Sequence, residues 1–377
     1  MKLRKKIVYV VNNLTTGGVT QIIKSTSITL CKYYDISIVS LSSKDSVWPN
    51  SHPVKVKYFD SNIIFEYSLI NYFQDIVFGK VFRNNYKEVI NFIISKNPDY
   101  LHFHTLPRFL KIGLLVKKKY DCQLVFTDHL VRISPKEYTL LIRTFLGIIY
   151  KQVYKHFNLI FVSKAVENVS RNFGFINSKY KNIRIDNGID LSTFQKKIKK
   201  ENQKIICIYV SRISLVKGHH ELVKAWSKLK LPDKQELWIV GPDEMNNTIQ
   251  DLCEDLGTNN VKILGNRPDI KELLLKSDLG VFPSEKEGLP LSLLEKMASS
   301  IPVVVSNIDE LTSIIEDNKD GLIYTLGNEN DLTKKLQRLI NNQELRLRLG
   351  RQARIKVEKR YSIDTVVNSL INFYTSL

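Results

Sequence analysis

The chain has 377 residues, of which 43% are hydrophobic and 25% charged. This composition excludes a disordered protein, and the length exceeds what one hydrophobic core comfortably serves, so we expect two domains. Lysine and arginine number 56 against 38 aspartates and glutamates, a formal net charge of +18. Residues 1–185 carry 28 cationic and 11 anionic residues, whereas residues 186–377 carry 28 and 27. The positive charge of the first half favours binding to an anionic partner, either nucleic acid or an anionic membrane surface. The alternative is a lysine-rich surface that is merely solvated.

The first apolar run, Ile7–Val11, is short and is followed by Asn12 and Asn13, which favours a buried strand over a signal peptide. No run approaches the roughly 18–20 apolar residues of a membrane span. The cysteines show no metal-binding spacing, and each lies beside or within an apolar run, so we expect buried thiols in a reducing compartment. Together these features predict a cytoplasmic protein. The cysteines are Cys31, Cys122, Cys207 and Cys253.

Along the first half, short β-rich runs alternate with amphipathic stretches such as Val19–Leu30, a pattern typical of a parallel α/β domain. We place this domain at residues 1–185. Its predicted strands are Lys6–Val11, Ile36–Leu41, Val54–Phe59, Tyr100–His104, Leu124–Thr127 and Leu159–Val162.

Two stretches of this half, residues 63–96 and 131–157, mix phenylalanine and tyrosine with lysine and arginine. Helices with an apolar-aromatic face and a basic rim can lie in a membrane interface. The alternative is that the aromatic residues belong to an ordinary core and the lysines to its rim.

Residues 186–203 are polar, lysine-rich and without periodicity, which predicts a linker, and the α/β pattern restarts after it in residues 204–360. The sequence therefore predicts two doubly wound domains with a cleft between them, and ligands in such folds bind beyond the carboxyl ends of the strands. The predicted strands of the second domain are Ile205–Tyr209, Glu236–Val240, Val261–Leu264, Leu279–Phe282 and Val303–Val305.

Paired glycines, Gly17 and Gly18, separate the first strand from the first helix. They either let the backbone approach a phosphate closely or form a plain turn. Because the segment is not GxGxxG, it gives little support to nicotinamide binding.

Two cations, Arg212 and Lys217, flank the turn that follows the strand at residues 205–210, and Gly218 relaxes the backbone beside them. Arginine donates to phosphate oxygens as a fork, and lysine offers a compact point charge. Their place beyond the carboxyl end of a strand favours a phosphate site over two ordinary surface cations.

Two carboxylates, Glu287 and Glu295, are separated by seven residues in the segment after the strand Leu279–Phe282. We expect residues 284–288 to form a loop and Pro290 to occupy the first helical position. Backbone N–H groups at the start of such a helix favour an anion. Carboxylates beside an anion site make sense if they hold sugar hydroxyls, which is the arrangement that a nucleotide-sugar enzyme needs.

Histidines end two strands of the first half: His102 and His104 at 100–104, and His129 after 124–127. We expect His102 and His104 to point to opposite faces. Strand-end histidines can position a substrate or handle a proton, although a structural, hydrogen-bonded histidine is the alternative. No DxD, HExxH or His/Cys cluster appears, so we expect no catalytic metal.

Taken together, the paired glycines, S-R-x4-K-G, the VKILG run and PSEKEGLPLSLLEKMASSIPVV resemble the retaining glycosyltransferases of family 4, the glycosyl transferases group 1 type. The resemblance extends over essentially the whole chain. It implies the GT-B fold, in which two Rossmann-like domains face a central cleft, and a last helix, at about 361–377, that packs back on the first domain. The IDNGID segment at 185–190 is similar to the hinge of that family.

The resemblance also implies roles for individual residues. Arg212 and Lys217 would bind the donor diphosphate, and Glu287 would hold hydroxyls of the donor sugar. Charge stabilisation of the leaving group is where most of the rate enhancement would arise. The further implied donor residues are Gly17 and Gly18 at the diphosphate, Arg267 at the base, Gly288, Leu289, Pro290 and Leu291 beside the sugar, and Glu295 at the ribose. On the acceptor side the implied residues are His129 at the transferred sugar, His104 and Asp128.

The implied activity is a retaining, metal-independent transfer of a hexose-type sugar from a UDP-sugar to a lipid-linked glycan of a bacterial surface polysaccharide, such as a capsule or O-antigen. No cofactor is expected besides the nucleotide-sugar co-substrate, and the basic first domain would dock on the inner face of the membrane. The chain departs from the family at Asp309, Glu310 and Ser313, where Gly-Gly and a later Glu are usual, and at Ser300, where Gly is common.

Two other functions stay open. A catalytically silent subunit could keep the fold and bind an acceptor or a partner glycosyltransferase, although it would not need Arg212, Lys217, Glu287 and Glu295 together. Nucleic-acid binding by the basic half ranks last, because no recognised motif accompanies the charge.

Overall fold

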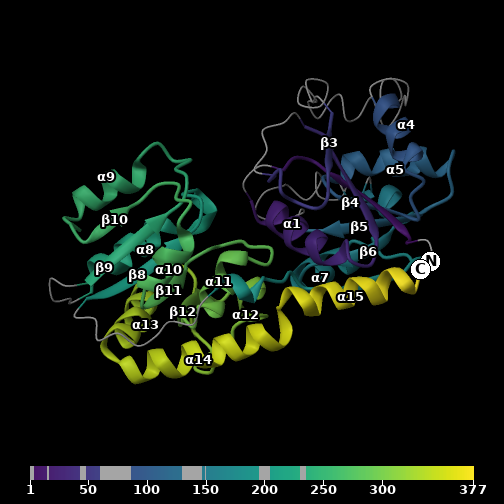
Figure 1. Cartoon of the computed structure of the whole chain (residues 1–377). Coiled ribbons are helices and arrows are strands. Elements are labelled where there is room, and N and C mark those ends of the chain that lie inside the picture. The colour runs from purple at the N-terminus through teal and green to yellow at the C-terminus, as the bar shows by residue number, and fades with distance from the viewer. Residues whose placement is uncertain are drawn as a thin grey trace. The chain divides into compact units, whose positions relative to one another are not determined.

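A computed structural model describes residues 4–14, 17–42, 48–59, 86–129, 147–148, 150–194, 204–229 and 235–377. The chain divides into two compact units, Met1–Asn187 with Val366–Leu377, and Gly188–Thr365. Each unit is built on a parallel sheet with helices against it (Figure 1). Most of the two basic aromatic stretches, namely 63–85, 131–146 and 149, lies outside the described residues, as do residues 195–203 of the expected linker.

The sheet of the first unit has the strand order β3-β2-β1-β4-β5-β6-β7, and its paired strands are parallel. The six predicted strands are confirmed, with ends shifted by up to two residues. The seventh, β7, was missed because it is a three-residue edge strand with one apolar side chain, Ile183. The strands are β1 (Lys6–Val11), β2 (Asp35–Ser40), β3 (Val56–Tyr58), β4 (Tyr100–His104), β5 (Gln123–Asp128), β6 (Asn158–Phe161) and β7 (Asn182–Arg184).

The last helix of the chain, α15 (Ile363–Thr375), packs on the first unit. Tyr100 of β4 donates its hydroxyl to the Tyr374 carbonyl at 2.8 Å, and the Tyr374 hydroxyl is hydrogen-bonded to His102. The segment most distant in sequence therefore helps to hold the centre of this sheet. The other helices of the unit are α1 (Gly18–Leu30), α4 (Lys87–Ser95), η1 (Pro107–Phe109), α5 (Leu110–Lys117) and α7 (Lys164–Asn172).

The sheet of the second unit has the order β10-β9-β8-β11-β12-β13. The five predicted strands are confirmed, and the short β13 was missed. The strands are β8 (Ile205–Val210), β9 (Gln235–Val240), β10 (Val261–Ile263), β11 (Leu279–Phe282), β12 (Val303–Ser306) and β13 (Leu322–Tyr324). The helices are η2 (Leu191–Thr193), η3 (Leu215–Lys217), α8 (His219–Ser227), α9 (Thr248–Asp255), α10 (Ile270–Lys276), α11 (Leu291–Ala298), α12 (Asp309–Thr312), α13 (Glu329–Asn341) and α14 (Gln343–Arg360).

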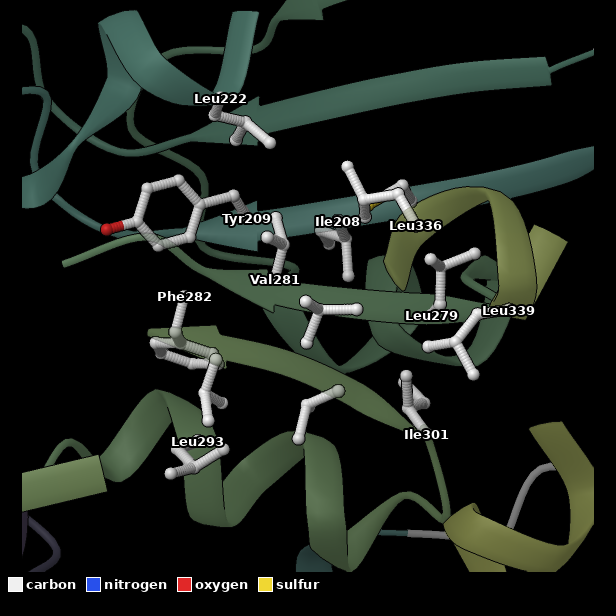
Figure 2. Close-up of a cluster of buried hydrophobic side chains, with 14 of the residues drawn as sticks. Ile208, Tyr209, Leu222, Leu279, Val281, Phe282, Leu293, Ile301, Leu336 and Leu339 are labelled. Carbon is white, nitrogen blue, oxygen red and sulfur yellow. The ribbon is translucent and has the colours of Figure 1, made fainter. Parts of the chain in front are cut away.

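The core of the second unit surrounds β8 and β11, whose apolar runs are continuous because both faces of the sheet are covered. Figure 2 shows Leu279 and Val281 of β11 between side chains of helices on either face, with the Tyr209 hydroxyl at the margin of the cluster. This packing makes the two strands a firm base for the loops that follow them.

Candidate functional site

In the second unit, two loops meet where the strand order reverses. β8 and β11 are parallel neighbours, and their connections run to opposite sides of the sheet. A reversal of this kind leaves a crevice at the carboxyl ends of the two strands, where ligands of open α/β sheets bind. The loop after β8 carries Lys217, and the loop after β11 carries Glu287. The fold therefore brings these two sequence-predicted residues to one place.

Gly218 allows the two loops to touch. Its φ is +69°, in the left-handed region, and a Cβ at this position would lie 2.0 Å from the Pro283 carbonyl oxygen. A backbone hydrogen bond from Glu285 N to Val216 O, at 2.9 Å, joins the same loops. A glycine is required here by both conformation and space.

Lys217 and Glu287 form an ion pair. The Lys217 Nζ lies 2.7 Å from Glu287 Oε1, and the two side chains are only 15% and 9% exposed. The Ser284 hydroxyl also donates to Glu287 Oε1 at 2.7 Å. An ammonium and a carboxylate held together with little water are strongly coupled, so removal of either leaves an uncompensated charge.

A layer of hydroxyl groups supports this pair and was not identified from the sequence. The buried Tyr209 hydroxyl donates to the Lys217 carbonyl at 2.9 Å and lies 3.1 Å from Ser284 Oγ. The Ser306 hydroxyl at the end of β12 donates to the Ser284 carbonyl at 2.6 Å. Burial, with the nearby Glu287, raises the pKa of Tyr209, so its hydroxyl stays protonated. These residues fix the loops from beneath.

The helix that follows Glu287 begins one residue later than predicted. Pro290 is the N-cap, with ψ 117°, rather than the first helical residue, and its carbonyl accepts from Leu293 N at 3.1 Å. An extended ψ and an accepting carbonyl are what define an N-cap. Gly288, Leu289, Pro290 and Leu291 thus form the entrance to α11, whose first N–H groups have no intrahelical acceptor.

Glu295 lies one turn into α11 and is partly buried. Burial raises the pKa of Glu295, while Lys296 and Lys271 act in the opposite direction. A partly desolvated carboxylate there is suited to accept hydrogen bonds from hydroxyl groups rather than to lie against a second anion.

Lys296 is a fully buried cation that the sequence interpretation missed. Its side chain crosses Gly280 of β11, where a Cβ would lie 2.4 Å from the lysine Cδ, and its Nζ lies 4.5 Å from the centre of the Phe282 ring. Burial lowers the pKa of Lys296 to about 8, although Glu295 favours its charged form. In the sequence, Lys296 and Met297 follow Leu293 at i+3 and i+4, which places Lys296 on the apolar face of the helix. This spacing could have identified Lys296 as a buried cation.

Arg212 and Arg267 each pair with an acidic residue other than Glu287. Arg212 Nη1 contacts both carboxylate oxygens of Glu244, at 2.9 and 3.2 Å, and the arginine side chain is 60% exposed. Arg267 follows the edge strand β10 and forms a two-point contact with Asp269 at 2.7 and 2.6 Å. Both arginines are thus held by acidic neighbours of their own rather than by Glu287.

A third carboxylate, Glu310, lies near Glu287. It occupies the first turn of α12, after β12, and is partly buried. Burial raises the pKa of Glu310, and the negative charges of Asp309 and Glu287 raise it further. The departure from the usual Gly-Gly therefore adds an acidic side chain beside the candidate site.

In the first unit, Gly17 and Gly18 form the start of α1, after β1. Gly17 is extended, with φ 168°, and a Cβ there would have nothing within 4 Å. The backbone conformation thus does not demand glycine at position 17. The sheet order reverses between β1 and β4, so the glycines lie on the same edge as the residues that end β4.

His104 of β4 and His129 after β5 are paired, with 2.9 Å between Nδ1 and Nε2. His102 and His104 share one face, with ring centres 4.2 Å apart, so the expectation of opposite faces was wrong. Alternate strand residues point to the same side of a sheet. Burial, with the other two imidazoles nearby, lowers the pKa of His104 well below its ordinary value.

Asp128, at the end of β5, accepts a hydrogen bond from the Tyr154 hydroxyl at 3.0 Å.

Within the described ranges, no three or more His, Cys, Asp and Glu side chains are grouped so that they could hold a metal ion. Over the same ranges, no helix is both long and apolar enough to cross a membrane. Of the four cysteines, Cys122, Cys207 and Cys253 are buried and Cys31 is partly exposed.

Residues 191–356 match the model of the family described as Glycosyl transferases group 1. The matched segment covers nearly all of the second unit, Gly188–Thr365. It contains both loops of the ion pair and the start of α11.

Two curated relatives are similar to part of the chain. One is N,N'-diacetylbacillosaminyl-diphospho-undecaprenol alpha-1,3-N-acetylgalactosaminyltransferase of Campylobacter jejuni, 33% identical over 226 residues, which are 56% of this chain and 59% of the relative. Another is the capsular polysaccharide biosynthesis glycosyltransferase CapM of Staphylococcus aureus, 26% identical over 201 residues, 50% of this chain and 53% of the relative. The chain thus spans somewhat more than half the length of these relatives.

The solved structure of HepE from Anabaena in complex with UDP and glucose is similar over 99% of this chain and 100% of its own, with a TM-score of 0.82 and 17% identity. The fold is therefore GT-B, two parallel-sheet α/β domains of Rossmann type. The family match and the relatives together support a glycosyltransferase.

Proposed function

We propose that the protein is a retaining glycosyltransferase of family 4 that takes a sugar from a UDP-sugar. The observation that carries the proposal is the Lys217–Glu287 pair, which lies at the carboxyl ends of β8 and β11 beside the entrance to α11. A cation, a carboxylate and helix N–H groups at one crevice suit a ligand that is anionic at one end and carries hydroxyl groups at the other. The UDP and glucose bound to HepE are ligands of this kind.

In the proposed complex the diphosphate takes over Lys217 and draws Arg212 away from Glu244. Lys217 can exchange Glu287 for the diphosphate, and Arg212 can exchange Glu244 for it, because each cation gains a doubly charged partner. Glu287 then accepts from hydroxyls of the donor sugar, and Glu295 from the ribose. Arg267 reads the base, and Gly17 and Gly18 admit the diphosphate to the start of α1.

We assign Lys217 and Arg212 the main catalytic effect, stabilisation of the charge that develops on the leaving diphosphate. The bond between the sugar C1 and the phosphate oxygen breaks, and the acceptor oxygen bonds to C1 on the same face. The acceptor proton passes to the departing phosphate oxygen. No step needs a metal ion or a further cofactor.

The acceptor side of the proposal rests on the first unit. His104 Nε2 is buried and has no hydrogen-bond partner among the described residues, so it can accept from or donate to an incoming hydroxyl. His129, paired with His104, would contact the transferred sugar, and Asp128 would border the acceptor. The buried, neutral state of His104 suits a hydrogen-bonding role rather than a permanent charge.

We further propose a lipid-linked glycan acceptor of a bacterial surface polysaccharide, with the protein at the inner face of the membrane. The names of the Campylobacter and Staphylococcus relatives, a diphospho-undecaprenol transferase and a capsule enzyme, support this class of acceptor. The excess of positive charge in residues 1–185 suits an anionic membrane surface. No nucleic acid is required.

A donor screen tests the proposal. Release of nucleotide from UDP-, GDP- and ADP-sugars is measured with a membrane extract as acceptor, for the whole chain and for Glu287→Gln. We expect release from a UDP-sugar that depends on the extract and disappears in the variant. A chain that binds no UDP at millimolar concentration in calorimetry, and releases no nucleotide, would instead be a silent subunit.

A further inference from the structure

Helix α5 of the first unit presents two different faces. Its inner face packs on the sheet through Ile112, Gly113 and Val116; at Gly113 a Cβ would lie 2.9 Å from the Phe103 ring. Its other face carries Lys111, Leu114 and Leu115, and the C-cap residue Lys118 continues the same spacing, i, i+3, i+4 and i+7. Residues at this spacing share one side of a helix.

That second face lines a cavity of about 660 Å³. The opposite walls come from Cys122 and the start of β5, from His156, which precedes β6, and from Tyr180, which precedes β7. The volume falls within the range of about 300–1,000 Å³ that is usual for small-molecule sites. The lining residues are Lys111, Leu114, Leu115, Lys117, Lys118, Cys122, Gln123, Leu124, His156 and Tyr180.

The cavity lies at the edge of the sheet away from the candidate acceptor residues. Gln123 begins β5 and His156 shortly precedes β6, whereas His104 and Asp128 end β4 and β5. All these strands are parallel, so the two groups lie at opposite ends of the sheet. At about 3.3 Å per residue, β5 separates them by roughly 17 Å. The cavity is therefore distinct from the acceptor side.

The cavity combines an apolar floor with a positive rim. Leu114, Leu115 and the Tyr180 ring are partly exposed to it. Lys117 is held by Asp121 and by the Cys122 carbonyl, at 2.8 Å, and Lys118 is exposed. Partial burial lowers the pKa of His156, as do the charges of Lys155 and Lys179, which shows that the rim is positive beyond the helix itself. A ligand that fits would have an anionic group joined to an apolar body.

We propose that this cavity binds an anionic phospholipid of a membrane surface. The phosphate of the headgroup lies against Lys111 and Lys118, and the first part of an acyl chain covers Leu114 and Leu115. Charge complementarity identifies the occupant, because the exposed Lys118 and the half-buried Lys111 attract phosphate, and the partly exposed leucines gain from an apolar chain. The inference adds a defined contact to the membrane association proposed above, and it does not depend on sugar transfer.

Vesicle binding tests it. The whole chain is mixed with phosphatidylcholine vesicles, with and without phosphatidylglycerol, and the bound fraction is measured by flotation. Lys118→Glu is compared with Lys119→Glu, because Lys119 is an exposed neighbour that makes the same change in net charge but does not line the cavity. Leu115→Ser is compared with Leu347→Ser, an exposed leucine of the second unit.

We expect binding only to vesicles with phosphatidylglycerol, and a loss of about fivefold or more for Lys118→Glu relative to Lys119→Glu. Leu115→Ser should also weaken binding while Leu347→Ser does not. Equal losses for the two lysine variants would overturn the proposal, because they would indicate diffuse attraction to the whole basic surface.

A soluble probe separates the lipid from its headgroup. Short-chain phosphatidylglycerol, used as a monomer, should bind more tightly than glycerol phosphate and lose affinity in Leu115→Ser. Equal binding of the two probes would overturn the lipid assignment in favour of a plain phosphate site. Calorimetry of UDP on the same samples reports the donor site independently, so failure of either proposal can be recognised.

Discussion

The Lys217 ammonium lies 2.7 Å from Glu287 Oε1, although the two residues come from loops after different strands. Both side chains are mostly buried, so each stabilises the charge of the other. A nucleoside diphosphate would compete with Glu287 for Lys217 and leave the carboxylate for sugar hydroxyls. The pair thus holds both side chains in place at the crevice where the proposed donor would bind.

Lys217→Ala should lower the rate of sugar transfer by about 10²–10³-fold, because it removes the charge nearest to the proposed leaving group. It should also weaken UDP binding in calorimetry. Lys224→Ala, an exposed lysine on the next helix, is the control and should keep both properties. Turnover of Lys217→Ala close to that of the unmodified chain would contradict the assignment.

Gly218→Ala should destabilise the second unit and impair UDP binding. The substitution combines a left-handed φ with a contact of 2.0 Å to the Pro283 carbonyl. Gly257→Ala is the matched control, because its φ is +63° but a Cβ there has nothing within 4 Å. We expect a cost of about 1 kcal/mol for Gly257→Ala and clearly more for Gly218→Ala, measured by denaturant unfolding. Equal costs would mean that the loops can separate without penalty.

The arrangement of strands could be predicted from sequence where the apolar runs are long. β1, β4 and β11 begin and end at the predicted residues. β1 and β11 are mostly apolar, as parallel strands buried on both faces are, and β4 alternates apolar residues with His102 and His104. β7 and β13 each have three residues, and pairing with a longer neighbour rather than their own sequence determines them. β3 and β10, the other edge strands, are equally short but were predicted, so three residues suffice only where neighbouring residues extend the pattern.

The candidate site was predictable to the level of its loops. Parallel strands place the loops of Lys217 and Glu287 on one edge, but no spacing indicates that the two side chains pair or that Tyr209 supports them. Such contacts depend on three-dimensional packing between segments distant in sequence. The same holds for Tyr374, which reaches His102 from the last helix.

Lys296→Met should stabilise the second unit at neutral pH and change how its stability depends on pH. The pKa of Lys296 is about 8 in the folded chain and ordinarily 10.5. Between these values the unfolded chain holds a proton that the folded chain lacks, so stability rises as the pH increases from 8 to 10.5. The variant should lose that rise and gain at most about 3 kcal/mol below pH 8.

Unfolding by denaturant at several pH values measures the effect, with Lys276→Met, an exposed lysine of the same unit, as control. If Lys276→Met changed the stability as Lys296→Met does, the effect would come from the net charge and not from the burial of Lys296. A less stable Lys296→Met at pH 7 would mean that the charge of Lys296 is needed by Glu295.

Tyr374→Phe should destabilise the first unit without affecting the donor site. The Tyr374 hydroxyl is 2.5 Å from His102 Nδ1, and both residues are buried. Its loss leaves a buried imidazole nitrogen without that partner, at a cost of about 1–3 kcal/mol. Tyr33→Phe, 55% exposed, should change nothing. Thermal unfolding measures stability and calorimetry with UDP checks the second unit; unchanged stability of Tyr374→Phe would show that water replaces the hydroxyl.

Glu310 gives the candidate site a second negative charge near the proposed sugar. Its carboxylate and that of Glu287 interact unfavourably, which contributes to the raised pKa of Glu310. A donor sugar that itself carries a carboxylate would bring a third negative charge to the same region. The chain should therefore prefer neutral sugars to uronic acids.

Glu310→Gln should relax this preference, because it removes one charge and keeps the shape of the side chain. We expect kcat/KM for UDP-glucuronic acid, relative to that for a neutral UDP-sugar, to rise about tenfold, the effect of 1.4 kcal/mol of repulsion. Asp309→Asn makes the same change in charge at the adjacent, exposed position and should leave the ratio unchanged. If both variants raised the ratio equally, the preference would come from the general negative potential of α12. If neither did, Glu310 would not face the sugar, and Glu287 alone would determine which donors are accepted.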